Sequence, residues 1–421
     1  MNKILGGLCI VVLLAIPSQV TFAETEDATL LRLEGQLRAI TAYVADRGTV
    51  WNSQRQTAVS DTRVRKSITD GVAWLVAAQE EDGHFAYEYL PYEDTYRADD
   101  NIVRQAGALY ALSEVARRSD TDGKETNEAI ERAIGFFERL SLEHEYEGTT
   151  VRCVTKSKES KVCKLGATTL ALTGILGYVE AYPKKAATYK DLIEGYNAFI
   201  VKSKKPNAGF RDEYIINKGF KGENESSFSN GEALLALVRY YQYKEDDVVK
   251  KVIDDTFNYL KETEFDTPLY LWIMASLKDM QRLWPNTAYT QYGTEYTNWR
   301  IQLLNSSHNT TRNYCASTEG LASAHTLLEG SATPVAQKRL RHEIDFWNTK
   351  NLSMQIDARH TYRLVNQGGK FVFKEVENMA QSQGGFLTAH DELTQRIDFT
   401  QHCVSTYLQT FVDIDGKNFS L

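Results

Sequence analysis

The stretch Gly231-Glu232-Ala233-Leu234-Leu235-Ala236-Leu237 decides the fold, because it opens with glycine and continues with small and apolar residues. A helix of this composition presents a narrow face that neighbouring helices can approach closely. Three other segments repeat the pattern: Gly107-Ala108-Leu109-Tyr110-Ala111-Leu112, Gly166-Ala167-Thr168-Thr169-Leu170-Ala171-Leu172 and Gly320-Leu321-Ala322-Ser323-Ala324. Repetition at this scale predicts helices that gather around a common axis.

Amphipathic helices accompany these small-residue segments. Apolar residues recur at intervals of three and four over 30–44 and 68–76, which is the helical period. The spacing of the small-residue segments predicts helical pairs of about sixty residues, with one further pair that includes residues 267–274. Strand-like alternation is clearest over 370–374.

A polar turn with glycine and phenylalanine follows three of the expected helices. The three copies are Gly83-His84-Phe85, Gly209-Phe210 and Gly384-Gly385-Phe386. Helix, turn and helix therefore form the repeating unit. We predict an all-α protein, an α/α toroid of about six or seven helical hairpins around a central axis.

The first residues predict an exported protein. Lys3 precedes an apolar run that ends near Ile16, and Thr21-Phe22-Ala23 has the small residues of a cleavage site. We expect a signal peptide over 1–23, an N-terminal helical segment over 24–66 and the toroid domain over 67–421. No later segment has the ~20 apolar residues that a membrane span needs. The expected location is the periplasm or the outside of the cell.

Charge and cysteines narrow the possibilities further. A formal net charge of -8 argues against nucleic acid as a partner, since phosphates require a basic face. Cys153 and Cys163 flank a short polar turn, and in an exported chain we expect them to form a disulfide. Whether Cys315 and Cys403 also pair is left open, and no Cys-x-x-Cys spacing favours zinc.

Short motifs carry a resemblance to known toroids. The segment from Gln79 to Phe85 resembles the glutamine and aromatic turn of terpene-cyclase and six-hairpin toroids. The strings 100–107, 383–386 and 396–402 are similar to bacterial proteins related to the carboxy-terminal toroid of D-glucuronyl C5-epimerases. The resemblance covers the chain from about Ile68 to its end. It implies a six-hairpin glycosidase-like fold that acts on carbohydrate.

In such a toroid the ligand lies where the inner helices begin, so polar residues at these positions are the first candidates. Asp100 is a candidate catalytic carboxylate, with Asn101, Arg104 and Tyr89 as candidate substrate-binding residues. Tyrosine rings stack on sugar rings, and acids bond their hydroxyl groups. The alternative is structural, because Asp100 and Arg104 have the spacing of an i,i+4 ion pair and Asp100 can cap a helix.

Two further helices begin with a carboxylate. Glu232 is a candidate substrate-binding residue, although the helix dipole favours an acid in a first turn regardless of function. Glu319 is the preferred catalytic carboxylate, because the small residues after it leave its face open. Its alternative role is that of a first-turn acid beside a capping residue.

The last candidate cluster spans residues 396–402. Asp398, Gln401 and His402 recur at intervals of three and four and line one face of an otherwise apolar helix. Buried polar groups of this kind must bond one another or a ligand. We expect Asp398 to be catalytic, and Arg396, Gln401 and His402 to bind substrate.

The expected function is that of an enzyme on a polysaccharide that contains uronic acid. Cleavage of a glycosidic bond requires two carboxylates, here Glu319 with Asp100 or Asp398. C5 epimerisation requires acid and base groups on opposite faces of the ring. The sequence leaves open whether the chain resembles a glycoside hydrolase or a uronyl C5-epimerase in its reaction.

The alternative from another class is a non-catalytic polysaccharide-binding or assembly protein that works with an export machinery. A terpene cyclase is disfavoured, because no convincing Asp-Asp-x-x-Asp motif is present. The chain lacks dinucleotide and phosphate-binding motifs, so we expect no cofactor. The remaining histidines, His84 among them, have no metal-ligand spacing; we expect no metal and assign them to the surface or the core.

Overall fold

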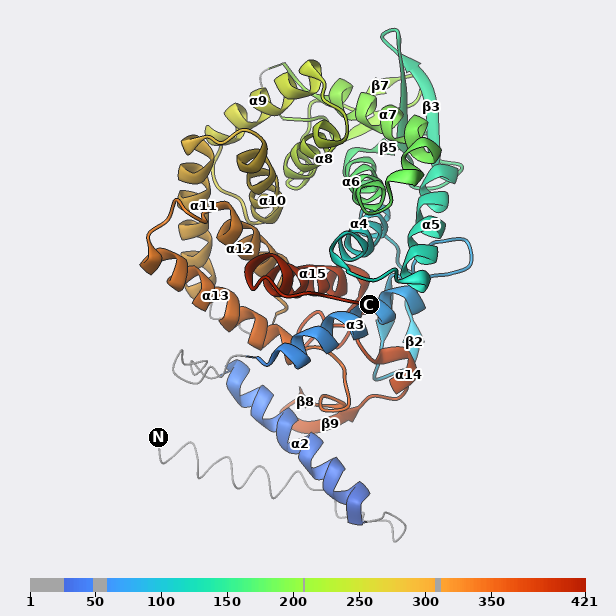
Figure 1. Cartoon of the computed structure of the whole chain (residues 1–421). Helices are drawn as coiled ribbons and strands as arrows, with labels where there is room; N and C mark the ends of the chain where they lie inside the picture. The colour runs from blue at the N-terminus through green and yellow to red at the C-terminus, as the bar shows by residue number, and fades with distance from the viewer. Residues whose placement is uncertain (1–25, 48–58, 207–208, 307–311) are drawn as a thin grey trace.

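The computed structural model describes residues 26–47, 59–206, 209–306 and 312–421. The predicted signal peptide lies outside these residues. Within the described residues, six inner helices form a ring (Figure 1). They are α4 (Ile102–Arg118), α6 (Leu165–Ala181), α8 (Ser229–Tyr243), α10 (Thr267–Leu283), α12 (Cys315–Leu327) and α15 (Ile397–Leu408).

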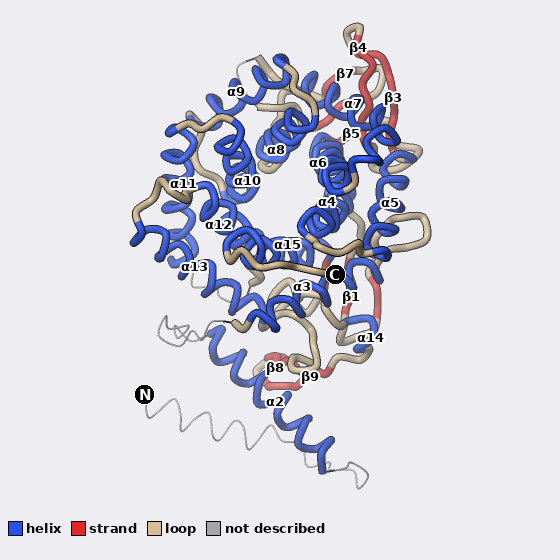
Figure 2. Tube along the Cα trace, in the orientation of Figure 1, coloured by secondary structure: helices blue, strands red, loops and turns tan. Residues whose placement is uncertain are grey.

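Each inner helix contacts the next in this order, and α15 contacts α4, so the ring is closed. Six outer helices surround it in the described part of the chain (Figure 2). They are α3 (Asp61–Ala77), α5 (Lys124–Arg139), α7 (Ala186–Ser203), α9 (Asp247–Lys261), α11 (Thr287–Ser306) and α13 (Pro334–Leu352). The predicted α/α toroid is confirmed, with six hairpins, and α10 is the inner helix expected around residues 267–274. Helix α3 crosses the boundary predicted at residue 67.

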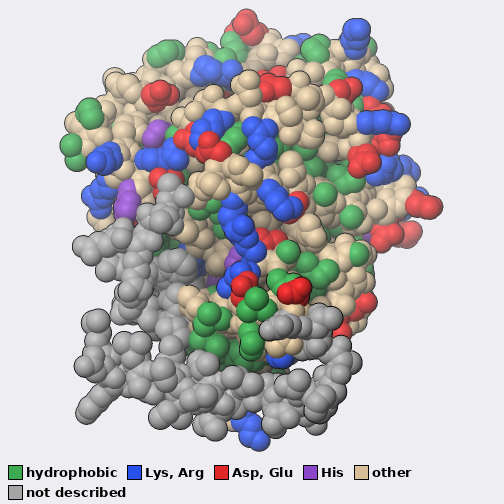
Figure 3. Space-filling model, turned by 60° about the horizontal axis from the view of Figure 1, so that its bottom comes forward, with side chains coloured by type: hydrophobic (Ala, Val, Ile, Leu, Met, Phe, Trp, Pro, Cys, Tyr) green, Lys and Arg blue, Asp and Glu red, His purple; other side chains and the backbone are tan. Residues whose placement is uncertain are grey.

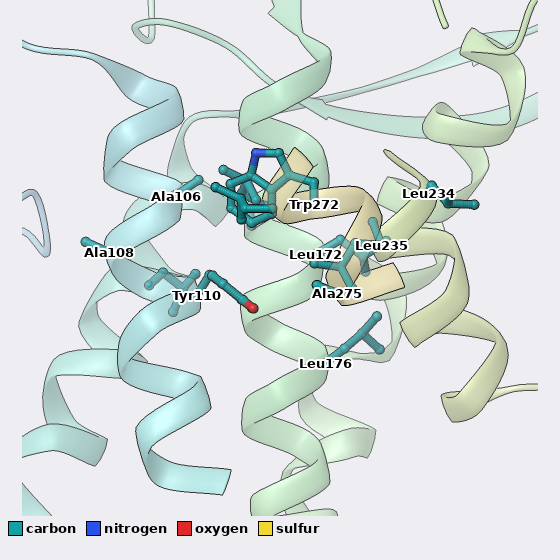
Figure 4. Packing of buried hydrophobic residues seen from close by; sticks show 14 of the residues in the cluster. Ala106, Ala108, Tyr110, Leu172, Leu176, Leu234, Leu235, Trp272 and Ala275 are labelled. Carbon is teal, nitrogen blue, oxygen red and sulfur yellow. The ribbon is translucent and has the colours of Figure 1, made fainter. Parts of the chain in front are cut away.

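Small side chains explain how the inner helices pack so closely. Gly174 on α6 lies where an added Cβ would be 3.1 Å from the backbone nitrogen of Tyr110 on α4. Alanines and leucines fill the spaces between helices, and Tyr110 and Trp272 occupy the interior of the ring (Figure 4). Each fully buried leucine contributes about 1.5–3 kcal/mol to the stability of this core.

The repeated glycine and phenylalanine turn has a structural purpose. In all three copies the phenylalanine backbone N–H donates a hydrogen bond to a side chain of the following inner helix. The acceptors are Gln105, Asn230 and Thr400. The turn therefore ties the end of an outer helix to the start of an inner one. Gly83 has a φ of 87°, which a residue with a side chain rarely adopts.

Short strands lie in the connections, and the sequence predicted only the one around 370–374. Within the described residues they form four small antiparallel sheets. These are β10 (Gln395–Arg396) with β1 (Glu88–Leu90) and β2 (Thr95–Tyr96), β3 (Ser141–Tyr146) with β4 (Thr149–Val154), β5 (Val162–Lys164) with β6 (Glu213–Ile215) and β7 (Gly219–Phe220), and β8 (Tyr362–Gln367) with β9 (Lys370–Glu375). Three short helices, η2 (Pro183–Lys185), α14 (Met379–Ser382) and the π-helix η3 (Gln409–Ile414), complete the described elements.

Helix α2 (Glu26–Arg47) lies outside the ring against β8. Ala39 packs in a small cluster with Tyr362 and Leu364. Leu31 and Leu37 are exposed, so the leucine face of this amphipathic helix does not face the toroid. No helix in the described ranges is long and apolar enough to cross a membrane.

Two disulfides are present among the described residues. Cys153 on β4 pairs with Cys163 on β5, as predicted. Cys315 on α12 pairs with Cys403 on α15, which answers the question that the sequence left open. The second bond joins two neighbouring inner helices.

Removing the Cys153–Cys163 bond by replacing both residues with serine should lower the free energy of unfolding by about 2–3 kcal/mol, because a short loop in the unfolded chain is freed. Chemical denaturation of the variant and the wild type under non-reducing conditions measures this difference. An unchanged midpoint and slope would contradict it.

Candidate active site

The inner helices begin at one end of the ring, because the outer helices between them return the chain to that end. We call this end the amino-end mouth. Glu232 lies in the first turn of α8, Asp398 in the first turn of α15, and Glu319 in the second turn of α12. The structure therefore places the predicted carboxylates at the same end of the toroid.

A cavity of about 340 Å³ opens at the amino-end mouth between α4, α6 and α8. Four of the predicted residues line it: Asp100, Asn101, Arg104 and Glu232. The other lining residues are Ile102, Val103, Lys156, Lys164, Gly166, Asp212, Ser226, Phe228 and Ser229. The cavity thus combines two predicted carboxyl groups with three cations and one exposed aromatic ring.

Asp100 is held in its ionised form by hydrogen bonds. It accepts one from Gln105 Nε2 at 2.8 Å and one from the Asn101 backbone nitrogen at 2.7 Å, and His84 Nε2 lies at 3.4 Å. Burial raises the pKa of Asp100, but the bonds from His84 and Gln105 outweigh burial, so its pKa lies below the usual value. Asn101 caps α4 by accepting from the backbone nitrogen of Val103.

Glu232 is in the opposite state. Its side chain is 1% exposed, and neither carboxyl oxygen has a hydrogen-bond partner among the described residues. Burial raises the pKa of Glu232 to about 7, although the charge of Arg104 acts in the other direction. Near neutral pH, Glu232 is therefore neutral in a large fraction of molecules while Asp100 is charged.

Asp398 does not line the cavity but contacts two arginines. Its Oδ1 accepts from Arg396 Nε at 3.0 Å, and its Oδ2 lies 3.4 Å from Arg104 Nε. The Arg104 guanidinium also lies over the ring of Phe228, 5.4 Å from its centroid. Asp398 thus positions Arg104 at the wall of the cavity, and its predicted catalytic role stays a prediction.

Glu319 and His402 form a buried pair inside the ring. Glu319 Oε2 lies 2.8 Å from His402 Nδ1, and the ring of His402 lies edge-on to Trp272 at 6.1 Å. The lining of the cavity contains neither residue. Glu319, the preferred catalytic carboxylate, is therefore separate from the cavity that holds Asp100 and Glu232.

Two other predicted residues do not reach this cavity. Gln401 packs between α15 and α4, where a Cβ at Gly107 would overlap its amide group. Tyr89 is buried in β1, and its hydroxyl donates to Asp94 at 2.5 Å. Both side chains support the protein around the mouth.

The residues that hold Asp100 in its ionised form were not predicted from the sequence. The sequence predicts His84 only as a surface or core group, whereas the structure places it beside Asp100, which raises the pKa of its imidazole. The repeated turn indicated this position, because His84 precedes Phe85, whose backbone N–H donates to Gln105 at the start of α4. Lys164, Asp212 and Phe228 lie on connecting segments with no repeated pattern to mark them.

Comparison with solved structures shows the same architecture. A sugar epimerase from a ruminal bacterium matches with a TM-score of 0.59 at 14% identity, over 85% of this chain and 99% of its own. The chain is an α/α toroid. An unsaturated glucuronyl hydrolase specific for heparin matches with a TM-score of 0.57 at 10% identity, over 86% of this chain and 100% of its own.

A third similar structure is an inactive variant of an α-1,6-mannanase from Salegentibacter in complex with α-1,6-mannotriose. Its TM-score is 0.55 at 9% identity, and the match covers 82% of this chain and 98% of that one. No protein-family model and no curated protein matches the sequence of this toroid. The resemblance to α/α toroids is confirmed at the level of the fold, whereas the narrower one to D-glucuronyl C5-epimerases stays a prediction.

Proposed function

We propose that this toroid is a carbohydrate-active enzyme that cleaves a glycosidic bond in the cavity at the amino-end mouth. The observation that carries the proposal is the presence on one cavity of two carboxyl groups whose pKa values are shifted in opposite directions. The pKa of Asp100 is lowered and that of Glu232 is raised. Glycoside hydrolysis uses such a pair, one acid to protonate the leaving oxygen and one carboxylate to assist attack.

The substrate is proposed to be a polysaccharide or oligosaccharide that contains uronic acid. Arg104, Lys156 and Lys164 supply positive charge at the cavity, and guanidinium groups bind carboxylates well. Phe228 offers an exposed ring beside them, on which the apolar face of a sugar can stack.

The similar structures support a carbohydrate-active enzyme, because they include both hydrolases and a sugar epimerase. The inactive Salegentibacter mannanase holds an oligosaccharide. Two disulfides in the described residues, together with the predicted signal peptide, support action in the periplasm or outside the cell.

The surface supports a glycan rather than a nucleic acid as partner. On the face seen in Figure 3, basic and acidic side chains are interspersed. Together with the net charge of -8, this distribution provides little attraction for the closely spaced phosphates of a nucleic acid.

Incubating the purified mature protein with a panel of glycans, half of them containing uronic acid, tests the function. We expect shorter oligosaccharides with new reducing ends from a uronic-acid-containing glycan, seen by NMR and by size. Unchanged chain length with inverted C5 centres would instead show an epimerase. Binding without any product would show the non-catalytic alternative, for which an export-machinery partner would then be sought.

A further inference from the structure

Among the described residues, the buried carboxyl group of Glu232 has no hydrogen-bond partner, and such a group requires an explanation. Burying an acid without a hydrogen bond is unfavourable, and most buried polar atoms are bonded. Glu225, in the same segment, shows the usual arrangement, because it accepts hydrogen bonds from Asn230 and from the backbone nitrogen of Gly209. The two glutamates therefore differ in their surroundings.

The neighbouring helix leaves room for the Glu232 carboxyl group. Gly166 lies at the start of α6, and a Cβ there would lie 2.7 Å from Glu232 Oε2. Both residues line the cavity at the amino-end mouth. The missing side chain at position 166 therefore keeps open the space in which this carboxyl group meets the cavity.

The charges around Glu232 come from several elements. Arg104 projects from α4, Lys164 from β5, and Lys156 and Asp212 from connecting segments. From α10, Trp272 and Leu269 pack against this turn, since a Cβ added at Gly231 would lie 2.8 Å from Trp272 Cβ and 3.4 Å from Leu269. Lys164 is engaged with Asp212 and Glu213, and Arg104 with Asp398.

We propose that Glu232 is the proton donor of this cavity and transfers its carboxyl proton to the glycosidic oxygen of the bound substrate. This inference rests on the proposed function, which it deepens by assigning the acid. Its support is the unpartnered, buried carboxyl group on the cavity, next to the space left by Gly166. The raised pKa agrees with the neutral form that a donor requires.

Hydrolysis begins with the proton transfer from Glu232. The Glu232 O–H bond breaks, and its proton joins the glycosidic oxygen as that oxygen leaves the anomeric carbon with both bond electrons. Water adds to the anomeric carbon and gives one proton to the Asp100 carboxylate. Glu232 is left as a carboxylate near Arg104, and solvent returns the proton from Asp100 to Glu232. The products are an alcohol and a sugar with a new reducing end.

The first measurement follows the protonation of Glu232 in the whole protein without substrate. Infrared difference spectra between wild type and Glu232→Gln, recorded across pH, should show a protonated carboxyl band that disappears as pH rises through about 7. Arg104→Met should move this transition to higher pH, because the favourable charge beside the carboxylate is removed. Loss of the band at the ordinary carboxyl pKa would overturn the proposal, whatever the glycan panel gives.

The second measurement follows turnover of the glycan that the panel identifies. Glu232→Gln should lower kcat/KM about 10²- to 10³-fold and remove the decline of the wild-type rate above pH 7, because the amide cannot donate the proton. A substrate with an activated aryl leaving group, which needs no protonation, should be cleaved by the variant at close to the wild-type rate. Wild-type activity of Glu232→Gln on the natural bond would overturn the donor role.

Matched controls separate this role from folding. Glu223→Gln changes an exposed glutamate of the same segment, which pairs with Arg211, and should leave kcat/KM within about twofold. Gly166→Ala should reduce turnover, whereas Gly177→Ala on the same helix, where a Cβ would have ordinary contacts of 3.4 Å, should not. Failure of the wild type on every glycan would overturn the proposed function, while the infrared titration would still report on Glu232 by itself.

Discussion

Replacing Asp100 by asparagine should reduce turnover of the cleaved glycan about 10³-fold while the protein stays folded. The amide has nearly the same volume as the carboxylate, and its oxygen can still accept the hydrogen bond from Gln105. The variant loses only the negative charge at the cavity. Initial rates at saturating substrate, with circular dichroism and thermal midpoints for both proteins, measure this effect.

A control at the opposite end of the same helix tests the assignment. Asp120 follows α4 and is exposed, so Asp120→Asn should have the turnover of the wild type. If Asp100→Asn cleaves the glycan as fast as Asp120→Asn does, the reaction does not use the carboxylate at position 100. The search would then move to the Glu319 and His402 pair inside the ring.

Replacing Arg239 by methionine should lower the free energy of unfolding by about 3–5 kcal/mol, because two buried carboxylates lose a partner. Arg239 Nε lies 2.6 Å from Asp279 Oδ2, and Arg239 Nη1 lies 3.4 Å from Glu114 Oε1. All three side chains are buried between the far ends of α4, α8 and α10. Urea denaturation at pH 7 measures the loss.

The pH dependence of this stabilisation has a defined sign. Burial raises the pKa of Asp279 and Glu114, but the surrounding cations, Arg239 among them, outweigh burial and lower both values. The stabilisation is therefore present above the carboxyl pKa of the unfolded chain and is lost as pH falls through the pKa values of the two carboxyls in the folded protein.

Arg282→Met is the control, since the Arg282 side chain is 61% exposed and lies 3.7 Å from Asp279. This variant should lower the free energy of unfolding by about 0.5 kcal/mol or less. Equal losses in the two variants would show that burial of the ion pair does not determine its contribution.

Most of the ring could be predicted from the sequence, because its local rules repeat. Glycine and small residues mark the starts of α4, α6, α8 and α12, since these helices all pack in the same way. The predicted toroid implied a closed ring but not which helices close it, because the contact between α15 and α4 joins residues that are almost the whole domain apart. Apart from the strand around 370–374, the short strands were not predicted, because they are set by their partners rather than by their own alternation.

The position of the site could be predicted from the sequence, but the ion pairs between its residues could not. The starts of the inner helices identified Asp100 and Glu232, yet Arg104 does not pair with Asp100 as the helical spacing allows. It lies 3.4 Å from Asp398, a partner that only ring closure supplies. Likewise, the space around the Glu232 carboxyl group is left by Gly166 of another helix. The burial that raises the pKa of Glu232 therefore could not be predicted from residues near it in the sequence.

The closing position of α15 has a consequence for how a newly made chain reaches this structure. The ribosome produces the other five inner helices first, and α15 then fits between α12 and α4. Until it does, the nascent protein has an open apolar slot, and Cys315 lacks its native partner Cys403. A chain that stops before α15 therefore leaves an aggregation-prone species, whereas the arrival of α15 fills the slot and allows the disulfide to form.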